Sequence, residues 1–238
     1  MGASDTIRKF HRGLIVSCQA PAGSPLDHPP FIAAMARAAE QGGAVGVRIA
    51  GATNIRRVKR VTCLPIIGIE KLRSRTSPVY ITPTLRSIQR IHAAGADIIA
   101  LDGTARKRPG NYSLEQMMET AKRGLQALVM ADVATVEEGI RAVELGADLV
   151  STTLSGYTEE TRSNSEGPDF DLLQMLVKHV EVPVILEGRV RTPGDILRAF
   201  ELGAYAVVVG TAITGIESLT REFANVAQVA RTGLRVRS

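Results

Sequence analysis

The sequence predicts an α/β protein, a single-domain (β/α)8 TIM barrel, from three observations. First, one pattern occurs four times: a helix end rich in small residues, then Gly-Ala, then an apolar β-run. The glycines of this pattern, Gly43, Gly95, Gly146 and Gly203, are 52, 51 and 57 residues apart. Second, one βα module takes roughly 25–30 residues, so each repeat holds two modules and four repeats imply eight strands. Third, 238 residues, 45% of them hydrophobic, are enough for one barrel-sized core.

Each of the four repeats ends in a predicted strand, and the other four predicted strands lie in the segments outside the repeats. Pro65 and Pro183 each begin one of these additional runs, where a missing N–H removes no needed ladder bond. Runs that are almost entirely apolar are typical of strands buried on both faces, as in parallel sheets. The repeats cover residues 38–50, 91–103, 142–153 and 199–210, and the additional strands are 14–19, 65–70, 127–132 and 183–188.

Amphipathic segments between the strands predict the outer helices. Apolar residues recur there at helical spacing, as in Phe31, Met35 and Ala38, and a further helix is expected over residues 193–202. The glycine of each Gly-Ala pair fits a helix C-cap before a short loop. Residues 1–12 are expected to form an extra N-terminal helix that closes the bottom of the barrel, and residues 231–238 a flexible tail.

The composition suits a small anionic substrate, although most of the charges are expected on solvated helix faces. The net charge is +5 and the pI is about 9.5, with basic residues scattered along the chain. Aromatic residues make up 4% and there is no Trp, which argues against single-stranded nucleic acid as a partner. No apolar run is long enough for a bilayer, and no secretion signal precedes Gly13. With two cysteines, Cys18 and Cys63, expected to be free, the sequence predicts a soluble cytoplasmic protein without a membrane partner.

The segment 182–211 predicts a phosphate-binding site. It holds two β-runs around a helix, a βαβ unit, and each run ends in glycine with polar residues. Glycines past neighbouring strands allow backbone N–H groups to approach an anion, and the loops after strands 7 and 8 are the usual phosphate site of such barrels. The predicted phosphate-binding residues are Gly188, Gly210 and Thr211, with Glu187 at the edge of the site.

Polar residues follow nearly every predicted strand, at the end where barrel enzymes hold their active sites. Glu187 and Lys71 are the acid/base candidates, expected on opposite sides of the barrel mouth. A lysine base must be neutral, so burial or nearby cations such as Arg48 and Arg189 must lower its pKa from ~10.4. Arg48 either clamps substrate oxygens or pairs with Asp132. The full set is Gln19, Arg48, Lys71, Asp102, Asp132, Thr152, Thr153, Glu187, Arg189 and Thr211.

Other classes of site find no support in the sequence. The four histidines fall in predicted helices or loops, and no His/carboxylate triplet has metal-ligand spacing. There is no Walker loop and no GxGxxG element, so we expect neither a metal nor a cofactor. Ser155 lacks a nearby histidine for a Ser-His-Asp arrangement. Two loops after strands 3 and 6, residues 73–80 and 156–168, are candidate lids.

Eight motifs stand beside the predicted strand ends: SCQA (17–20), GVRIAG (46–51), PIIGIEK (65–71), ALDGTARKRP (100–109), MADVATVEEG (130–139), STTLSGYT (151–158), EGRVRTP (187–193) and GTAIT (210–214). In this order, from about Leu14 to Phe223, they resemble the N-acetylmannosamine-6-phosphate 2-epimerase family. STTLSGYT together with SCQA is specific for this family, whereas EGR and GTAIT resemble phosphate-binding motifs that many barrels share.

The resemblance implies a cytoplasmic homodimeric barrel enzyme of amino-sugar and sialic acid catabolism, without a metal or redox cofactor. It implies interconversion of N-acetylmannosamine 6-phosphate and N-acetylglucosamine 6-phosphate by deprotonation and reprotonation at C2. Lys71 resembles the catalytic lysine and Glu187 its partner carboxylate, and Arg48 is the expected stabiliser of the enolate oxygen. The sugar-binding residues are then Gln19, Arg48, Asp132 and Arg189, and the phosphate contacts Gly188, Gly210 and Thr211.

The chain departs from the family pattern at two places. Gly215 stands where the family usually has Arg, so phosphate is held more weakly or another basic residue compensates. Glu70 and Leu72 flank Lys71 where an apolar and a basic residue are usual, and strand alternation is expected to point Glu70 away from Lys71. Two alternatives follow: another phosphate-binding TIM-barrel isomerase or synthase, and a non-catalytic sugar-phosphate-binding paralogue.

Overall fold

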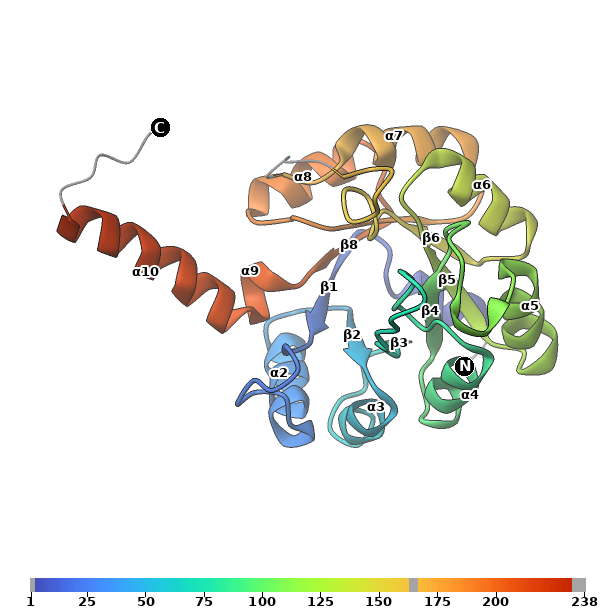
Figure 1. The fold of residues 1–238 in the computed structure, drawn as a ribbon, viewed down its shortest axis with the longest axis horizontal. Helices are drawn as coiled ribbons and strands as arrows, with labels where there is room; N and C mark the ends of the chain where they lie inside the picture. The colour runs from blue at the N-terminus through green and yellow to red at the C-terminus, as the bar shows by residue number, and fades with distance from the viewer. Residues whose placement is uncertain (1–2, 163–166, 233–238) are drawn as a thin grey trace.

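Eight parallel strands close into a barrel in sequence order, which confirms the predicted fold class (Figure 1). The structure is a computed structural model that describes residues 3–162 and 167–232. Each strand pairs with its sequence neighbour, and β8 closes the barrel against β1 through Ile15 and Val208. The strands are β1 (Gly13–Cys18), β2 (Gly46–Ala50), β3 (Ile66–Ile69), β4 (Ile98–Asp102), β5 (Leu128–Asp132), β6 (Leu149–Ser151), β7 (Val184–Glu187) and β8 (Ala206–Val209).

Helices connect the strands and form the outer layer. The N-terminal helix α1 covers part of the range expected for it, and α8 ends one residue before its predicted limit. The additional predicted strands also differ from the observed ones by one residue at their ends; β1, for example, leaves Gln19 in the following loop. The helices are α1 (Ala3–Arg8), α2 (Pro29–Gln41), α3 (Ala52–Val58), α4 (Leu85–Ala93), η1 (Pro109–Asn111), α5 (Leu114–Glu119), η2 (Thr120–Gly124), α6 (Val136–Glu144), α7 (Phe170–His179), α8 (Pro193–Glu201), α9 (Thr211–Thr214) and α10 (Ile216–Thr232).

The repeated glycines end the helices as predicted. Gly43, Gly95, Gly146 and Gly203 have φ of 91°, 93°, 97° and 94°, the left-handed conformation that favours glycine at a helix C-terminus. Each is followed by a short loop into the next strand. The fourfold pattern in the sequence therefore records the same helix-to-strand turn at four places around the barrel.

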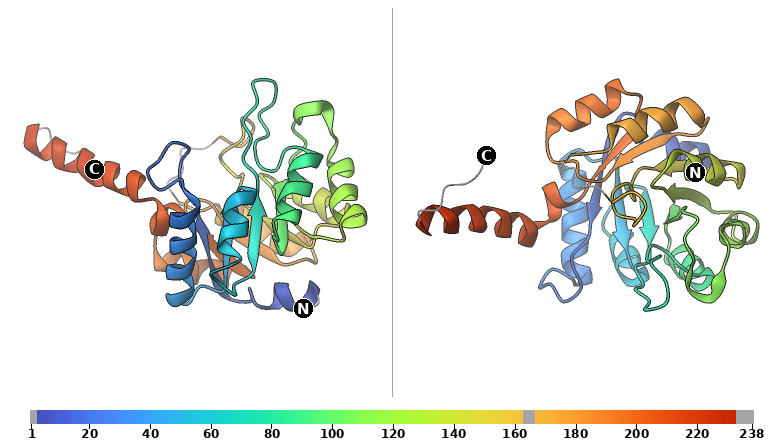
Figure 2. Two further views of the ribbon diagram at one scale, coloured as in Figure 1. Left: turned by 90° about the horizontal axis from the view of Figure 1, so that it is seen from below. Right: turned by 45° about the horizontal axis from the view of Figure 1, so that its top comes forward.

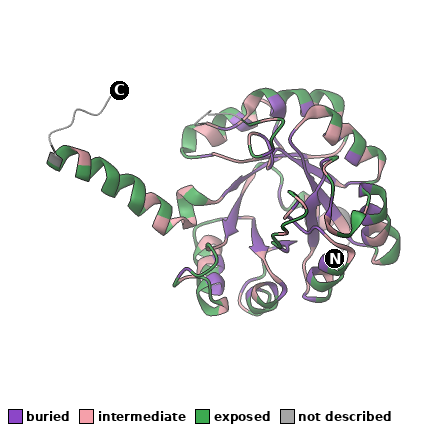
Figure 3. Cartoon of the chain, in the orientation of Figure 1, coloured by how far each residue is buried: buried purple, intermediate pink, exposed green. Residues whose placement is uncertain are grey.

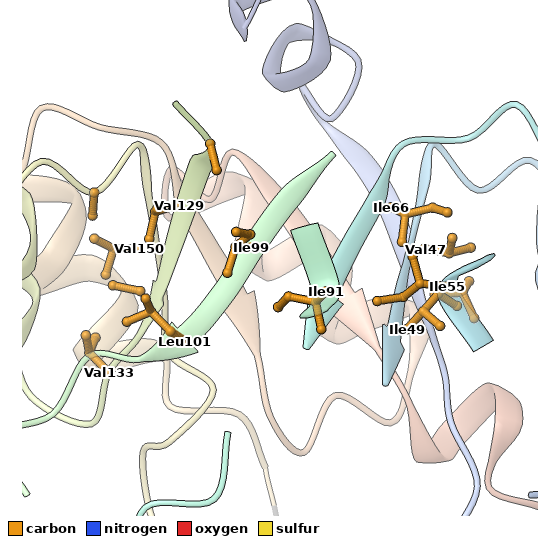
Figure 4. Close-up of a cluster of buried hydrophobic side chains, with 14 of the residues drawn as sticks. Val47, Ile49, Ile55, Ile66, Ile91, Ile99, Leu101, Val129, Val133 and Val150 are labelled. Atoms are coloured by element: carbon orange, nitrogen blue, oxygen red, sulfur yellow. The ribbon is translucent and has the colours of Figure 1, made fainter. Parts of the chain in front are cut away.

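Strand alternation divides the core into two layers. Outward-facing residues such as Val47 and Ile49 pack against Ile55 of α3 and Ile91 of α4, and Figure 4 shows part of this layer. Inward-facing residues fill the barrel itself, among them Ile67, Met130, Ile185 and Val208, and the burial colours show that the strands are the most enclosed part of the fold (Figure 3). Every residue's position on a strand therefore decides whether it reaches the helices or the barrel interior.

The barrel interior is apolar at its floor. Phe10, which follows α1, is fully buried and belongs to the interior cluster with Ile15 and Ile98. Its ring lies so close to Gly46 of β2 that a Cβ at residue 46 would come within 2.4 Å of it. The N-terminal segment thus closes the bottom of the barrel, and polar side chains are left to the carboxyl ends of the strands.

The last helix leaves the barrel instead of covering it. Figures 1 and 2 show α10 leading away from α9 into solvent. Its apolar residues are open there: Phe223 is 75% exposed, and Ile216 and Val226 are each 57% exposed. No helix in residues 3–162 or 167–232 is long and apolar enough to cross a bilayer. The predicted tail, 231–238, lies outside the described residues from 233 onward.

Gly68 of β3 lies against neighbours that leave no room for a side chain. A Cβ at this position would come within 2.6 Å of the Ala96 Cβ and 3.0 Å of the Ile55 Cδ1. Gly68→Ala is expected to lower the free energy of unfolding by about 1–3 kcal/mol, because overpacking forces strand and helix apart. Denaturant unfolding measures this, with Gly124→Ala as the control, since nothing lies within 4 Å of that position. Equal stability of the two variants would contradict the packing described here.

Candidate functional site

A cavity of about 650 Å³ opens at the carboxyl ends of the strands. This volume is typical of small-molecule sites. Asp132 is predicted to bind the substrate but does not line the cavity. It is fully buried beneath the lining residues and contacts two of them, Arg48 and Thr153. The structure brings the other residues with such predicted roles together around this space: Gln19, Arg48, Lys71, Glu187, Gly188, Arg189, Gly210 and Thr211.

Arg48 lies at the bottom of the cavity between two carboxylates. Its guanidinium donates to both oxygens of Asp132, at 3.0 and 2.6 Å, and to Oε2 of Glu187 at 2.6 Å. The Arg48 side chain is 1% exposed, Asp132 is fully buried and Glu187 is 14% exposed. The pairing of Arg48 with Asp132 is therefore present, and the same guanidinium also fixes the carboxylate of Glu187.

This cluster carries one positive and two negative groups in a buried space. Burial alone would lower the Arg48 pKa, but the charges of Asp132 and Glu187 hold this pKa above its ordinary value. Burial raises the pKa of Glu187, and the charge of Asp132 adds to this against the opposing effect of Arg48. These effects together favour the protonated form of the Glu187 carboxyl group.

Thr153 contacts both carboxylates of the cluster. Its hydroxyl oxygen lies 2.9 Å from Oδ1 of Asp132 and 3.0 Å from Oε2 of Glu187. A hydroxyl has one hydrogen and can donate to only one of two carboxylates, so the second contact is a hydrogen bond only when that carboxyl group is protonated. The neighbouring Thr152 fixes the backbone of Glu187 by accepting from its N–H at 3.1 Å and donating to its carbonyl at 2.9 Å.

Lys71 stands on a short hairpin that follows β3. Its backbone forms an antiparallel bridge with Ile81, and Leu72 N–H donates to the carbonyl of Tyr80 at 3.0 Å. Withdrawal from bulk water lowers the pKa of Lys71, and the positive charge of Arg48 lowers it further. Although the residue is exposed towards the cavity, both effects favour the neutral amine that a base requires.

Glu70 points away from Lys71, as strand alternation predicts. It is 5% exposed and its carboxylate forms an ion pair with Arg90 of α4, with 3.2 Å between Oε1 and Nε. Its carbonyl also accepts from Thr82 N–H at 2.7 Å. Glu70 therefore ties the hairpin to the outer layer, and its charge is held on the opposite side of the strand from the Lys71 amine.

Two loops with glycine provide a backbone surface suited to an anion. Gly188 has φ of 112°, a conformation that disfavours any side chain, and Gly210 precedes α9 as its N-cap without a side-chain cap among the described residues. Unclaimed N–H groups at a helix start favour negative charge. Thr214 holds α9 in place by donating to the carbonyl of Ser17 at 2.9 Å, and the carbonyl oxygen of Gly210 lies 3.2 Å from the same hydroxyl. Gly188, Gly210 and Thr211 thus line one side of the cavity.

Arg189 braces the loop that follows β6. It has φ of 56°, and its guanidinium donates to the carbonyls of Gly167 and Ser155, each at 2.7 Å. The same guanidinium lies 5.4 Å from the centre of the Tyr157 ring. This anchors both ends of the loop 156–168 at the cavity, while residues 163–166 of that candidate lid lie outside the described part of the chain.

Only some of the polar residues predicted at the strand ends line the cavity. Asp102 is fully enclosed and does not line the cavity, because Arg106 and the Thr104 hydroxyl bind its carboxylate at 2.7 and 2.6 Å. The prediction that side chains from all eight ends converge is therefore wrong for Asp102. Conversely, the prediction left out several cavity-lining residues, among them Ser17, Tyr80 and Arg191. Alternation on β1 could have indicated Ser17, which pairs in register with Arg48.

The site offers acid/base groups and hydrogen-bond donors, with no cluster that would hold a metal. No group of three His, Cys, Asp or Glu side chains with suitable placement occurs in residues 3–162 and 167–232. Two polar atoms at the cavity, Gln19 Oε1 and Arg48 Nε, are buried without a hydrogen-bond partner in the same part of the chain. Such atoms are suited to an oxygen- and nitrogen-rich ligand.

The sequence matches a family model described as "Putative N-acetylmannosamine-6-phosphate epimerase" over residues 32–229. A similar protein from Caldanaerobacter subterraneus subsp. tengcongensis is 48% identical over 220 residues, covering 92% of this chain and 92% of that protein. Another from Cutibacterium acnes is 49% identical over 213 residues, covering 89% of this chain and 92% of that protein. Both are named "Putative N-acetylmannosamine-6-phosphate 2-epimerase".

Solved structures give the same relationship. The N-acetylmannosamine-6-phosphate 2-epimerase from Clostridium perfringens superposes with a TM-score of 0.88 at 44% identity, covering 92% of this chain and 95% of that one. A thiamine phosphate pyrophosphorylase from Pyrococcus furiosus has a TM-score of 0.59 at 16% identity, covering 87% and 90%. The second likeness shows a shared barrel fold alone.

Removing Arg48 is expected to leave two buried carboxylates without their counter-charge. Arg48→Met should lower the free energy of unfolding by about 3–5 kcal/mol near neutral pH. The Glu187 pKa, already raised, then rises further, so protonation relieves the repulsion and the loss shrinks as the pH falls to about 5. Unfolding in denaturant at several pH values tests this. Arg37→Met, at an exposed position of α2, is the control, and a pH-independent loss would contradict the role of Glu187.

Proposed function

Because the chain belongs to the N-acetylmannosamine-6-phosphate epimerase family, it is a carbohydrate 2-epimerase, and we propose that Lys71 moves the C2 proton of the substrate. The observation that carries this proposal is the shared cavity. Lys71, with its lowered pKa, faces the same space as the buried Arg48–Glu187 pair and the glycines 188 and 210. One end of the cavity thus suits a phosphate and the other suits a proton transfer at carbon.

The substrate class is N-acetylmannosamine 6-phosphate and its C2 epimer. In our proposal the phosphate binds the backbone N–H groups of Gly188, Gly210 and Thr211, which line the cavity beside α9. The open-chain sugar then extends towards Arg48 and Lys71. Gln19 accepts a hydrogen bond from the sugar through its unpartnered Oε1, and Arg189 completes the sugar-binding side of the cavity.

The reaction begins when the neutral amine of Lys71 removes the proton from C2, next to the aldehyde. The electron pair of the C2–H bond moves into an enolate whose charge lies largely on the aldehyde oxygen. Arg48 stabilises that oxygen, because its guanidinium is held rigidly by Asp132 and needs no rearrangement. Glu187, with its raised pKa, supplies and recovers a proton at a substrate oxygen. The enolate then turns over in the cavity so that its other face meets the Lys71 ammonium, and return of the proton to that face gives the epimer.

Lys71 is the residue whose loss stops this chemistry. Lys71→Ala should lower epimerisation by a factor of at least about 10² to 10⁴, because it removes the group that accepts the C2 proton. Incubation with N-acetylmannosamine 6-phosphate in deuterated water, followed by NMR, measures both deuterium at C2 and the epimer. Wild-type protein that yields neither product would refute the assigned function. A variant that keeps full activity would remove Lys71 from the mechanism.

Glu187→Gln distinguishes the two possible targets of the carboxyl group in the same experiment. If Glu187 acts on a substrate oxygen, the variant loses C2 exchange and epimerisation in parallel. Exchange at C2 without inversion would instead show that Glu187 protonates carbon from the opposite face, as its position on β7 across the barrel from β3 would allow. Circular dichroism confirms that both variants are folded.

The reaction belongs, in our proposal, to amino-sugar and sialic acid catabolism in the cytoplasm. The two cysteines support a reducing compartment, since Cys18 is buried, Cys63 is exposed, and both are free thiols. The buried thiol of Cys18 has a pKa raised to about 12 by burial, so it is an inert packing group. The role of the substrate in catabolism rests on the family alone.

The functional unit is a homodimer in our proposal, with α10 of each subunit packed on its partner. In a (β/α)8 barrel the helix after β8 ordinarily belongs to the outer ring. Here α10 has 17 residues and projects away, with Ile216, Phe223 and Val226 open to solvent. Isolated helices of this length are marginal in water, so a second copy that covers the apolar face supplies the missing packing.

Phe223→Asp is expected to convert the dimer into monomers. Burying a carboxylate in an apolar contact destabilises the dimer, because the charge loses its hydration. Asn225→Asp, on the opposite face of α10, should leave the dimer intact. Light scattering coupled to size-exclusion chromatography measures the mass of each variant. A wild-type protein that is monomeric at micromolar concentration would refute this part of the proposal.

A further inference from the structure

Arg191 differs from the other two arginines that line the cavity in how it is held. Arg48 is committed to Asp132 and Glu187, and Arg189 to the carbonyls of the loop after β6. Arg191 instead pairs with Glu222 of α10, with 3.0 Å between Nη1 and Oε1. The two side chains are 60% and 53% exposed. Exposed ion pairs of this kind are weak, so this guanidinium is available to a stronger anion.

The backbone presents Arg191 at the phosphate side of the cavity. It lies three residues after Gly188 and lines the same space as Gly210 and Thr211. The carboxylate of Asp195 accepts from the N–H groups of Arg191 and Thr192, each at 2.9 Å, as part of the cap of α8. The start of α8 is therefore already satisfied, and what the loop offers to an anion is the side chain of Arg191.

The opposite edge of the cavity has no room for a cationic side chain. Gly215 lines the space after α9, but a Cβ there would come within 2.7 Å of both the carbonyl oxygen and the Cγ2 of Thr211. A side chain at residue 215 would thus displace Thr211, which itself belongs to the phosphate-binding surface. Residue 215 therefore offers no side-chain cation to a phosphate, whereas the β7–α8 loop offers Arg191.

We propose that Arg191 binds the phosphate group of the substrate, and that Glu222 of α10 competes with phosphate for this guanidinium. The inference rests on the proposed function, since it names the charge that complements the glycine surface of the same site. A phosphate dianion offers three acceptor oxygens to the planar guanidinium, whereas Glu222 reaches it through one. Binding of the phosphate therefore frees Glu222, and the first turns of α10 respond to occupation of the cavity.

Two variants with opposite expected effects test this. Arg191→Ala should raise both the KM for N-acetylmannosamine 6-phosphate and the inhibition constant of inorganic phosphate by about tenfold, with kcat unchanged. Glu222→Gln should lower both constants, because it removes the competitor and leaves the guanidinium in place. Arg221→Ala removes a charge of α10 outside the cavity lining and should alter neither constant.

The opposite signs separate a binding role from a structural one. If the Arg191–Glu222 pair merely braced α10, both variants would shift the constants in the same direction or not at all, and either result would overturn the inference. Epimerisation by the wild-type protein is measured first. If that activity is absent, the proposed function is refuted and the role of Arg191 is judged separately. Calorimetry of inorganic phosphate binding needs no turnover, so it tests the role of Arg191 even in that case. Unfolding midpoints of all variants confirm that each is folded.

Discussion

The buried Arg48 guanidinium, held between Asp132 and Glu187, is the interaction on which the site depends. It joins β2, β5 and β7 at the centre of the barrel, where the apolar interior gives way to the cavity. Removing three charged groups from water is costly, and their mutual attraction offsets that cost only when the geometry is good. The barrel supplies this geometry, since Arg48 of β2 and Asp132 of β5 both face inward and meet there. The arrangement of the proposed catalytic groups and the stability of the fold thus depend on the same two ion pairs of Arg48.

The same cluster sets the protonation of the groups around it. One cation is shared by two carboxylates, so a proton on Glu187 reduces a charge imbalance that the buried setting penalises. The positive charge of Arg48 also acts on Lys71 across the cavity, in the direction of the neutral amine. Burial and the fixed guanidinium therefore both favour a neutral Lys71 amine, whereas burial and Asp132 favour the protonated form of Glu187 against the effect of Arg48.

The number of strands and the direction of many side chains could be predicted from the sequence, because the periodicity of a strand or helix is set by residues close together in the chain. The glycine repeat indicated the number of strands, and the alternation of side chains correctly turned Lys71 inward and Glu70 outward. The partners chosen at the strand ends depend on distant parts of the chain. Asp102 ends β4 as Asp132 ends β5, yet Asp102 is bound by Arg106 of the following loop and Asp132 by Arg48, 84 residues away in the sequence. Local sequence patterns predict neither this distant pairing of Asp132 nor the course of α10.

The position of α10 follows from the same crowding that shapes the phosphate side of the cavity. Gly215 ends α9 with a backbone turn that lies directly on Thr211, and α10 begins at the next residue on a new course. Its first turns remain at the cavity through Glu222 and through the Ser24–Glu217 hydrogen bond, while the later turns point away. A helix fixed to the substrate site at one end and to a second subunit at the other would transmit any movement of Glu222 between them. In the proposed dimer, substrate binding and subunit packing would then act on the same helix.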